Sequence, residues 1–204
     1  NPVVHLHSHT KSEIAYDDAL ASFVPKNAYN NGHVCAGFIN GVVTYKNALK
    51  QGAEAGAEAA RRAGLDAEPA SAPSVSNDTA GLDLKAMWKL PSDKPAHKER
   101  AFVDIQNDVT AKDLKLALSE GYDNIEHVKR YTTTGMATDQ GKTANVNALG
   151  IVAKQKGVDL PEVGYTTFRQ PYSPISFGAI IGRNFGYYQF APRRKTPMHD
   201  WHVR

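Results

Sequence analysis

Cysteine is almost absent from this sequence, since Cys35 is the only one among 204 residues. A single cysteine excludes a disulfide framework, a zinc ribbon and a cysteine-ligated iron–sulfur cluster within the chain. Long apolar runs are also missing, because no stretch approaches the roughly 18 residues that a membrane-spanning helix needs. No signal peptide is visible, so we expect a cytoplasmic protein that does not bind a membrane.

An excess of one charge is missing as well. The chain has 24 Lys and Arg against 21 Asp and Glu, a formal net charge of +3. This charge is too weak and too mixed to indicate binding to nucleic acid or to a membrane surface. With 41% hydrophobic and 22% charged residues, the composition is that of an ordinary soluble globular protein. The length suits one to two domains with a real core.

Both ends of the sequence lack the polar character that is usual for domain termini. The chain starts with Asn1 and an apolar pattern begins at once, whereas Trp201 and Val203 stand at the other end. We interpret the chain as a segment of a longer polypeptide. The alternative is a small complete protein with processed ends.

The N-terminal third has the order strand, glycine turn, helix. Alternation over residues 3–9 predicts a strand with His5, His7 and His9 on one face. The apolar run 34–43 is interrupted by glycines, which indicates a tight turn or a close backbone approach.

A helix is expected over residues 44–63, with Thr44 as its N-cap and Gly64 as its stop. Its apolar face consists of small residues, so it should lie close to a sheet. The order suits the last layer of a dinucleotide-binding α/β domain.

The middle of the chain changes from linker to helical module. Residues 65–81 are rich in Pro, Ser and Ala, which is typical of a linker, and the apolar island 82–90 should pack onto a neighbour. A short strand is expected over 102–105. Three helices should follow; the first begins at a capping box, Thr110 to Asp113, and ends at Gly121, and the others cover about 122–131 and 142–156. Such a module is too small to be readily stable on its own.

The remaining residues, 158–204, contain five prolines and crowded aromatics, which indicates irregular or β structure at the start of a further domain. The overall fold class is therefore mixed α and β.

Several possible centres of chemistry are weak. Three histidines at spacing two on a strand splay too far apart for one metal ion, so we expect no metal site. Cys35 stands among apolar residues and is interpreted as a small buried hydrophobe. His199 and His202 near the chain end are a weak signal for acid–base catalysis, and we assign no catalytic residue.

The glycines at 135 and 141 invite comparison with a phosphate-binding P-loop. Five residues separate them where the motif needs four, and they follow a helix instead of a strand. We therefore reject a nucleotide triphosphatase.

The physics of phosphate binding still applies to this bend. Lys129 and Arg130 end one predicted helix, hydroxyls follow at 132–134, and residues 140–143 open the next helix. Cations, hydroxyls and free N–H groups at a helix N-terminus together favour a phosphate. The alternative is a solvated, well-capped loop.

The string EHVKRYTTTGMATDQGKT over 126–143, with FVDIQNDVT over 102–110, resembles the α subunit of heterotetrameric sarcosine oxidase. This resemblance implies four parts. Residues 1–65 would end an FAD/NAD-type dinucleotide-binding domain, and 66–97 would be a linker. Residues 98–160 would form a small helical domain, and 161–204 would begin an aminomethyltransferase-like, β-rich folate-binding domain.

The helical module also resembles a [2Fe–2S] ferredoxin-like domain of the bacterioferritin-associated type. The four positions that match its cluster cysteines hold Asp104, Gln106, Asp139 and Ala144. The resemblance therefore implies a scaffold without its cluster.

The family implies a role in the oxidative demethylation of sarcosine to glycine, with formaldehyde or methylene-tetrahydrofolate and hydrogen peroxide as the other products. Its β subunit carries the amine-oxidising flavin, and an FMN lies at the subunit interface. FAD and tetrahydrofolate belong to the whole enzyme.

The implied site residues are all cofactor-binding. Lys129, Arg130 and Thr132 would hold the FMN phosphate, with Thr133, Gln140 and Lys142 as weaker candidates, and Ala36, Gly37 and Gly41 would lie near NAD. Two alternatives remain: a non-catalytic docking module between subunits, or the equivalent subunit of a related secondary-amine dehydrogenase.

Overall fold

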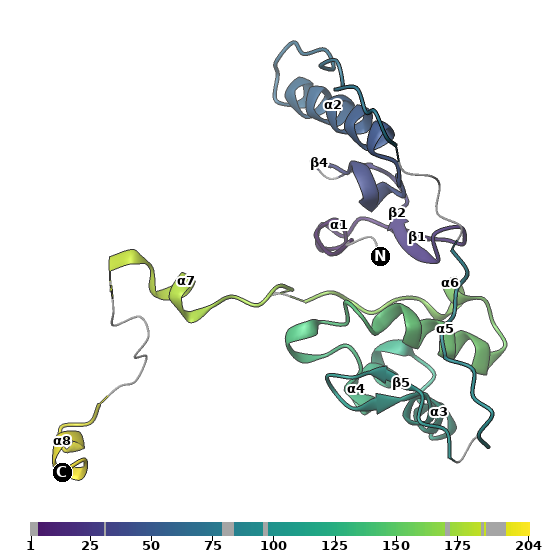
Figure 1. Ribbon diagram of the computed structural model, residues 1–204, viewed down its shortest axis with the longest axis vertical. Coiled ribbons are helices and arrows are strands. Elements are labelled where there is room, and N and C mark those ends of the chain that lie inside the picture. The colour runs from purple at the N-terminus through teal and green to yellow at the C-terminus, as the bar shows by residue number, and fades with distance from the viewer. Residues whose placement is uncertain are drawn as a thin grey trace. The chain divides into compact units, whose positions relative to one another are not determined.

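The computed structural model describes residues 4–30, 32–78, 84–95, 98–169, 172–184, 186 and 195–204. The chain divides into two units, residues 1–169 and 170–204 (Figure 1). The predicted mixed class is confirmed, since the described residues form helices and short strands. Every described sheet has two antiparallel strands: β1 with β2, β3 with β4, and β5 with β6.

The first part of the larger unit runs through small elements into one long helix. In chain order these are α1 (His5–His9), β1 (Ile14–Asp17), β2 (Ser22–Pro25), β3 (Tyr29–Asn30), β4 (His33–Val34), the 3₁₀ helix η1 (Gly37–Asn40) and α2 (Tyr45–Arg62).

The strand predicted over 3–9 is wrong where the structure describes it, because His5–His9 is the short helix α1. Residues 1–3 lie outside the described residues. Val4 and His7 are buried while Leu6 is 66% exposed, which is a helical spacing of three and not an alternation. The pattern misled because His7, a polar residue, is the one that enters the interior.

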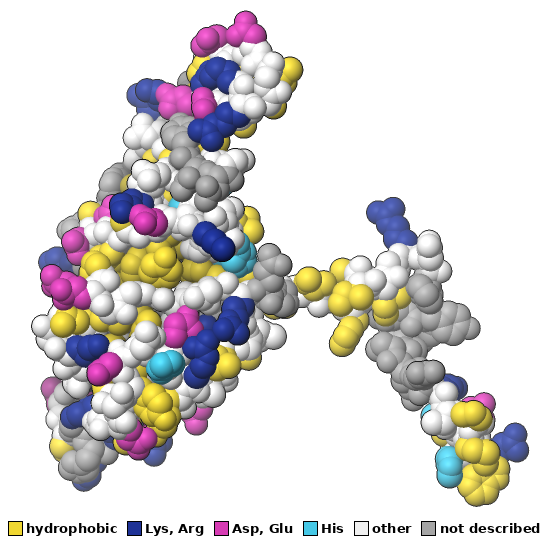
Figure 2. Space-filling view, turned by 180° about the vertical axis from the view of Figure 1, so that it is seen from behind, with side chains coloured by type: hydrophobic (Ala, Val, Ile, Leu, Met, Phe, Trp, Pro, Cys, Tyr) yellow, Lys and Arg dark blue, Asp and Glu magenta, His cyan; other side chains and the backbone are white. Residues whose placement is uncertain are grey.

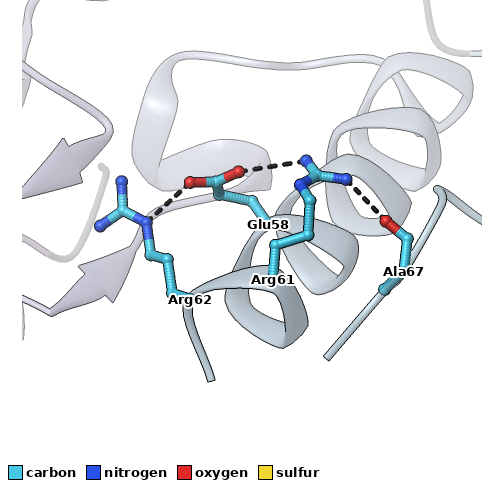
Figure 3. A network of polar contacts seen from close by, with 4 residues as sticks. All are labelled: Glu58, Arg61, Arg62 and Ala67. Carbon is cyan, nitrogen blue, oxygen red and sulfur yellow. Dashed lines mark hydrogen bonds and ion pairs between the residues drawn. The ribbon is translucent and has the colours of Figure 1, made fainter. Parts of the chain in front are cut away.

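The helix predicted over 44–63 is confirmed as α2. The Thr44 side chain accepts a hydrogen bond from Asn47 N, and Gly64 follows the helix with a φ of +84°. Glu58 accepts from both Arg61 and Arg62, and Arg61 also donates to Ala67 O at 2.8 Å (Figure 3). This network fixes the path by which the chain leaves the helix.

The helix packs against a strand through small residues, as predicted, but its glycines are not the points of contact. A Cβ at Gly52 or Gly56 would meet nothing within 4 Å. The buried residues of the helix are Ala55 and Ala57, and α2 packs against η1 and β4.

Residues 65–78 contain no helix or strand, as the linker prediction requires. Of the apolar island, residues 82 and 83 lie outside the described residues. Trp88 packs on the core of the helical module, and a Cβ at Gly150 would lie 2.2 Å from its ring. The island therefore contacts the core of the module through Trp88, while Met87 and Leu90 stay exposed.

The helical module consists of a hairpin and a group of helices. Its elements are β5 (Phe102–Asp104), β6 (Val109–Thr110), α3 (Ala111–Ser119), α4 (Ile125–Thr132), the 3₁₀ helix η2 (Ala137–Asp139), α5 (Asn145–Lys156) and α6 (Leu160–Val163). The predicted capping box is confirmed, since Asp113 Oδ2 accepts from Thr110 N at 2.7 Å. The hairpin β1–β2 joins this core through Phe23.

The third helix begins later than expected. Residues 140–143 precede α5, because Gln140 and Gly141 have left-handed backbones with φ of +51° and +75°. The side chain of Asn145 occupies the space that a Cβ at Gly135 or Gly141 would need. Both glycines are therefore required by the close approach of this side chain.

The second unit contains α7 (Phe177–Ile181) and α8 (His199–His202). Residues 183, 184 and 186 are 3₁₀-helical, and the rest of 164–204 that the structure describes is irregular and has no strand. The aromatic residues Phe185, Tyr187, Tyr188 and Phe190 lie outside the described residues, as does Arg194.

The core of the helical module predicts a contrast between two leucines of α3. Leu114 is fully buried and Leu116 is 49% exposed. We expect Leu114→Ala to lower the free energy of unfolding by about 2–5 kcal/mol, because it removes buried apolar atoms and leaves a cavity. Leu116→Ala, the matched control on the same helix, should change it by less than about 1 kcal/mol. Urea unfolding of both variants measures this, and equal losses would contradict the assigned core.

Candidate anion-binding site

The candidate site is built on α4, whose inner face packs into the core. Ile125 and Val128 are buried, and Lys129 follows at the edge of this packing. Burial lowers the pKa of Lys129; nearby Glu126 opposes this effect, while Arg130 and Arg169 add to it. The net result is an ammonium group with a pKa below its ordinary value, which a bound anion would stabilise.

Arg130 lies on the same helix, where it is held by Glu126. Its Nη1 donates to Glu126 Oε2 at 2.7 Å and to Glu126 O at 2.6 Å. Glu126 also accepts from Thr167 N, a residue 41 positions further along. The helix and this later segment are thereby held together by one carboxylate.

Burial raises the pKa of Glu126, but the Thr167 N–H, Arg130 and Lys129 lower it, and the sum leaves it below its ordinary value. The carboxylate is therefore ionised at neutral pH. Lys129 and Arg130 lie close to this carboxylate, and Arg169 lies close to Lys129, so these four side chains together carry an excess of two positive charges. Figure 2 shows Lys and Arg side chains lying beside Asp and Glu side chains on the face that it draws.

Arg169 is a site residue that sequence reasoning missed. It follows an irregular stretch 40 positions after Lys129, so neither helical spacing nor a motif connects the two. Glu126 precedes Lys129 by three residues, and its hydrogen bond with Thr167 brings the segment that contains Arg169 to α4.

The threonine hydroxyls that follow α4 are committed within the chain. Thr132 Oγ1 donates to Val128 O at 2.7 Å and pairs with Thr134 Oγ1 at 2.7 Å. Thr133 has a left-handed backbone, and its hydroxyl donates to Thr132 O. These hydroxyls close the end of α4.

Gln140 and Lys142 lie in different surroundings from Lys129. Gln140 Nε2 donates to Ala137 O at 2.7 Å, and Lys142 Nζ approaches Asp139 O at 3.4 Å. The positive charge of Lys142 also contributes to lowering the pKa of His5, so this lysine faces α1. The structure therefore does not make residues 140–143 the start of a helix beside Lys129.

The turn at Ala36, Gly37 and Gly41 is formed by η1 and its ends. Gly37 N donates to Gln51 Oε1 at 2.6 Å, which ties the turn to α2. Gly37 and Gly41 have φ of +78° and +77°, and a Cβ at Gly37 would meet nothing within 4 Å. The backbone is open at Gly37, but its N–H is already bonded.

The positions that match cluster cysteines hold a polar network. Asp104 is 1% exposed; its Oδ2 accepts from Gly135 N at 2.7 Å and from Asn107 Nδ2 at 2.9 Å. Gln106 Oε1 accepts from Asp139 N at 3.0 Å, and Ala144 is buried. A carboxylate that ties two loops together occupies one of these positions and none of them is a cysteine, so these residues do not fit an iron–sulfur cluster.

The histidines at the start of the chain do not share a strand face. His9 Nε2 bonds to Phe168 O at 3.1 Å, whereas His7 lies beside His33 and Cys35. Cys35 is buried as predicted, but its surroundings are not purely apolar. His199 and His202 are in α8 and are not buried.

Among the described residues, no helix is both long and apolar enough to cross a membrane.

Part of the chain matches a known family of protein domains. Residues 98–183 match the family model of the sarcosine oxidase A3 domain. This range contains α3, α4 and α5, and with them the cationic group around Lys129.

Two relatives match along the whole chain or nearly all of it. The chain is 41% identical over 207 residues to sarcosine oxidase subunit alpha of Corynebacterium sp. (strain P-1), a match that covers 100% of this chain and 21% of the relative. It is 40% identical over 201 residues to the same subunit of Rhizobium meliloti (strain 1021), covering 98% of this chain and 20% of the relative. The predicted resemblance to this subunit is confirmed, and the chain spans about a fifth of these relatives' length.

A solved structure shares the fold. The crystal structure of L-proline dehydrogenase from P. horikoshii has a TM-score of 0.65, with 19% identity, covering 90% of this chain and 37% of that chain.

The Asp104 network predicts the effect of a single-atom change. In Asp104→Asn an amide NH₂ replaces one acceptor oxygen and faces other donors. We expect a loss of about 1–3 kcal/mol in the free energy of unfolding, because a buried donor is left without a partner. Asp108→Asn, the exposed control in the same hairpin, should change little. Denaturant unfolding decides, and equal values for the two variants would refute the role given to Asp104.

The lowered pKa of Glu126 predicts a pH dependence. A carboxyl group with a lowered folded pKa stabilises the protein above its ordinary pKa of 4.5, and this contribution is lost as the pH falls through the folded value. Glu126→Gln should therefore be less stable than the parent at pH 7 and should approach it in acid. Glu68→Gln, an exposed glutamate of the linker, should show no such convergence. Thermal unfolding over a pH series tests this; a constant gap would count against it.

Proposed function

We propose that this chain corresponds to a segment of the alpha subunit of a heterotetrameric sarcosine oxidase. The enzyme would oxidise sarcosine to glycine, with formaldehyde or methylene-tetrahydrofolate and hydrogen peroxide as the other products. Support comes from relatives about 40% identical along the whole chain and from the A3 domain match. The chain itself would hold cofactors and dock subunits, and it would be inactive alone.

The proposed domain arrangement follows the same resemblance. Residues 1–65 would end an FAD/NAD-type domain, 66–97 would link it to the small helical domain 98–160, and 161–204 would begin the aminomethyltransferase-like domain. The irregular stretch 65–78 supports the linker, and the core shared by α3, α4 and α5 supports the helical domain. The fold shared with a proline dehydrogenase is consistent with this arrangement.

The single observation that carries the cofactor role is the excess positive charge around Lys129. A half-buried ammonium with a lowered pKa, beside Arg130 and Arg169, favours a phosphate dianion over water. The residues therefore fit the phosphate of FMN, which supplies redox chemistry when bound. Lys129 would be the central contact, and Arg130 would contribute through the side of its guanidinium that does not bind Glu126.

The other proposed phosphate residues have supporting roles. Thr132 and Thr133 would shape the end of α4, since their hydroxyls already bond within the chain. Gln140 and Lys142 remain weaker candidates because their contacts are with residues 137–139.

Fewer observations support the proposed contact with NAD. Ala36 and Gly41 flank η1, and the space on the Cα of Gly37 is open, although its N–H is bonded to Gln51. A dinucleotide could approach this open backbone closely, as it does at other glycine turns.

The expected partners are the other subunits, chiefly the flavin-bearing β subunit, with FMN between them. A non-catalytic docking module is the second candidate. It is favoured by exposed apolar side chains on and beside the β5 hairpin, Phe102 at 53% and Ile105 at 85% exposure. Docking alone would require no group of cations, so FMN content separates the two.

The proposed function predicts the FMN content of the purified complex. Lys129→Ala/Arg130→Ala should reduce retained FMN at least tenfold, because two cations that face the phosphate are removed. Lys115→Ala/Lys154→Ala removes the same charge from exposed positions of α3 and α5 and should retain FMN. FMN is measured by its absorbance after release, alongside subunit composition. Normal FMN content in Lys129→Ala/Arg130→Ala would contradict the cofactor role and would favour the docking module.

A further inference from the structure

Three side chains from different parts of the N-terminal region converge on one point. His7 Nδ1 lies 2.8 Å from His33 Nε2 and 3.4 Å from Cys35 Sγ. All three donor atoms lie within 4.8 Å of one another. His7 is in α1, His33 is in β4, and Cys35 follows β4, held by its own N–H to Ala28 O. The convergence therefore brings together positions 26 and 28 residues apart.

The tautomer of His7 is fixed by its other nitrogen. Nε2 lies 3.0 Å from Glu13 O, and a carbonyl oxygen can only accept a hydrogen bond. Nε2 therefore carries the proton, and Nδ1 of the neutral ring presents one lone pair to His33 and Cys35.

Hydrogen bonds alone do not satisfy all the polar atoms of these three side chains. The His33 Nε2–H and the Cys35 S–H would both have to donate to the one lone pair of His7 Nδ1. The other nitrogen of His33, Nδ1, is buried without a hydrogen-bond partner. His7 is 1% exposed and Cys35 is 8% exposed, so water gives little compensation. A group that accepts several lone pairs at once would resolve the conflict.

We propose that His7, His33 and Cys35 bind a divalent metal ion of the zinc type. Two imidazole nitrogens and one thiolate are a donor set that zinc prefers. Tetrahedral zinc places such donors roughly 3.3–3.6 Å apart, so the observed separations need only small side-chain adjustments. The Glu13 carbonyl provides the outer hydrogen bond that orients a metal-binding histidine.

Binding of the metal ion releases one proton. Cys35 loses its thiol proton to solvent, the thiolate binds the ion, and both imidazoles bind as neutral rings. Without the ion, burial raises the pKa of Cys35 and keeps it a thiol. Three protein ligands leave a fourth position for water or another group. The ion would fasten α1 to β4 directly ahead of the turn at Ala36 and Gly37.

The test measures zinc in the intact protein purified with its partner subunits. Metal analysis should find one equivalent of zinc fewer per chain in Cys35→Ser and in His33→Gln than in the parent. His202→Gln, a histidine of α8 outside the cluster, is the matched control and should keep the parental content. The use of two variants guards against one that fails to fold. Comparison between variants removes any zinc bound elsewhere in the assembly.

Cobalt substitution gives a second readout that a merely structural role would not move. In the parent, Co²⁺ should produce a thiolate-to-cobalt charge-transfer band that is absent in Cys35→Ser and retained in His202→Gln. Equal zinc content in parent and both cluster variants, with no difference in the cobalt spectrum, would overturn the proposal. It would leave the FMN proposal untouched, because Lys129 and Arg130 take no part in either readout.

Discussion

The burial of Val128 in the core of the helical module is the constraint on which the candidate site depends. Val128 is fully buried in a core that includes residues of α3 and α5, and α4 packs against α3, which sets the rotation of α4 about its axis. Because neighbouring residues on a helix are rotated by a fixed angle, this anchor determines where Glu126, Lys129 and Arg130 must lie. The charge pattern is therefore a consequence of packing.

Polar side chains then hold the loops around this core. The Asp104 carboxylate ties the β5–β6 hairpin to the loop at Gly135, and Glu126 ties α4 to Thr167. Each carboxylate is satisfied by several donors, and each connects segments that are far apart in the sequence.

Much of the fold could be predicted from the sequence wherever local signals act alone. Thr44 and Gly64 bounded α2, and Thr110 with Asp113 marked the start of α3, because caps depend on neighbouring residues. Prediction failed where tertiary contacts decide. The buried His7 made α1 resemble a strand, and the left-handed backbones of Gln140 and Gly141 delayed the start of α5. Arg169 and the meeting of His7 with His33 and Cys35 depend on long-range contacts that no spacing reveals.

The protonation behaviour of Lys129 tests the central claim most directly. In the complex with its lysines isotope-labelled, NMR titration follows the ammonium group of Lys129 with and without FMN. The account predicts a pKa below the ordinary 10.5 in the FMN-free protein, and a rise when FMN binds, because the phosphate stabilises the charged form. An ordinary pKa that does not change on addition of FMN would contradict it.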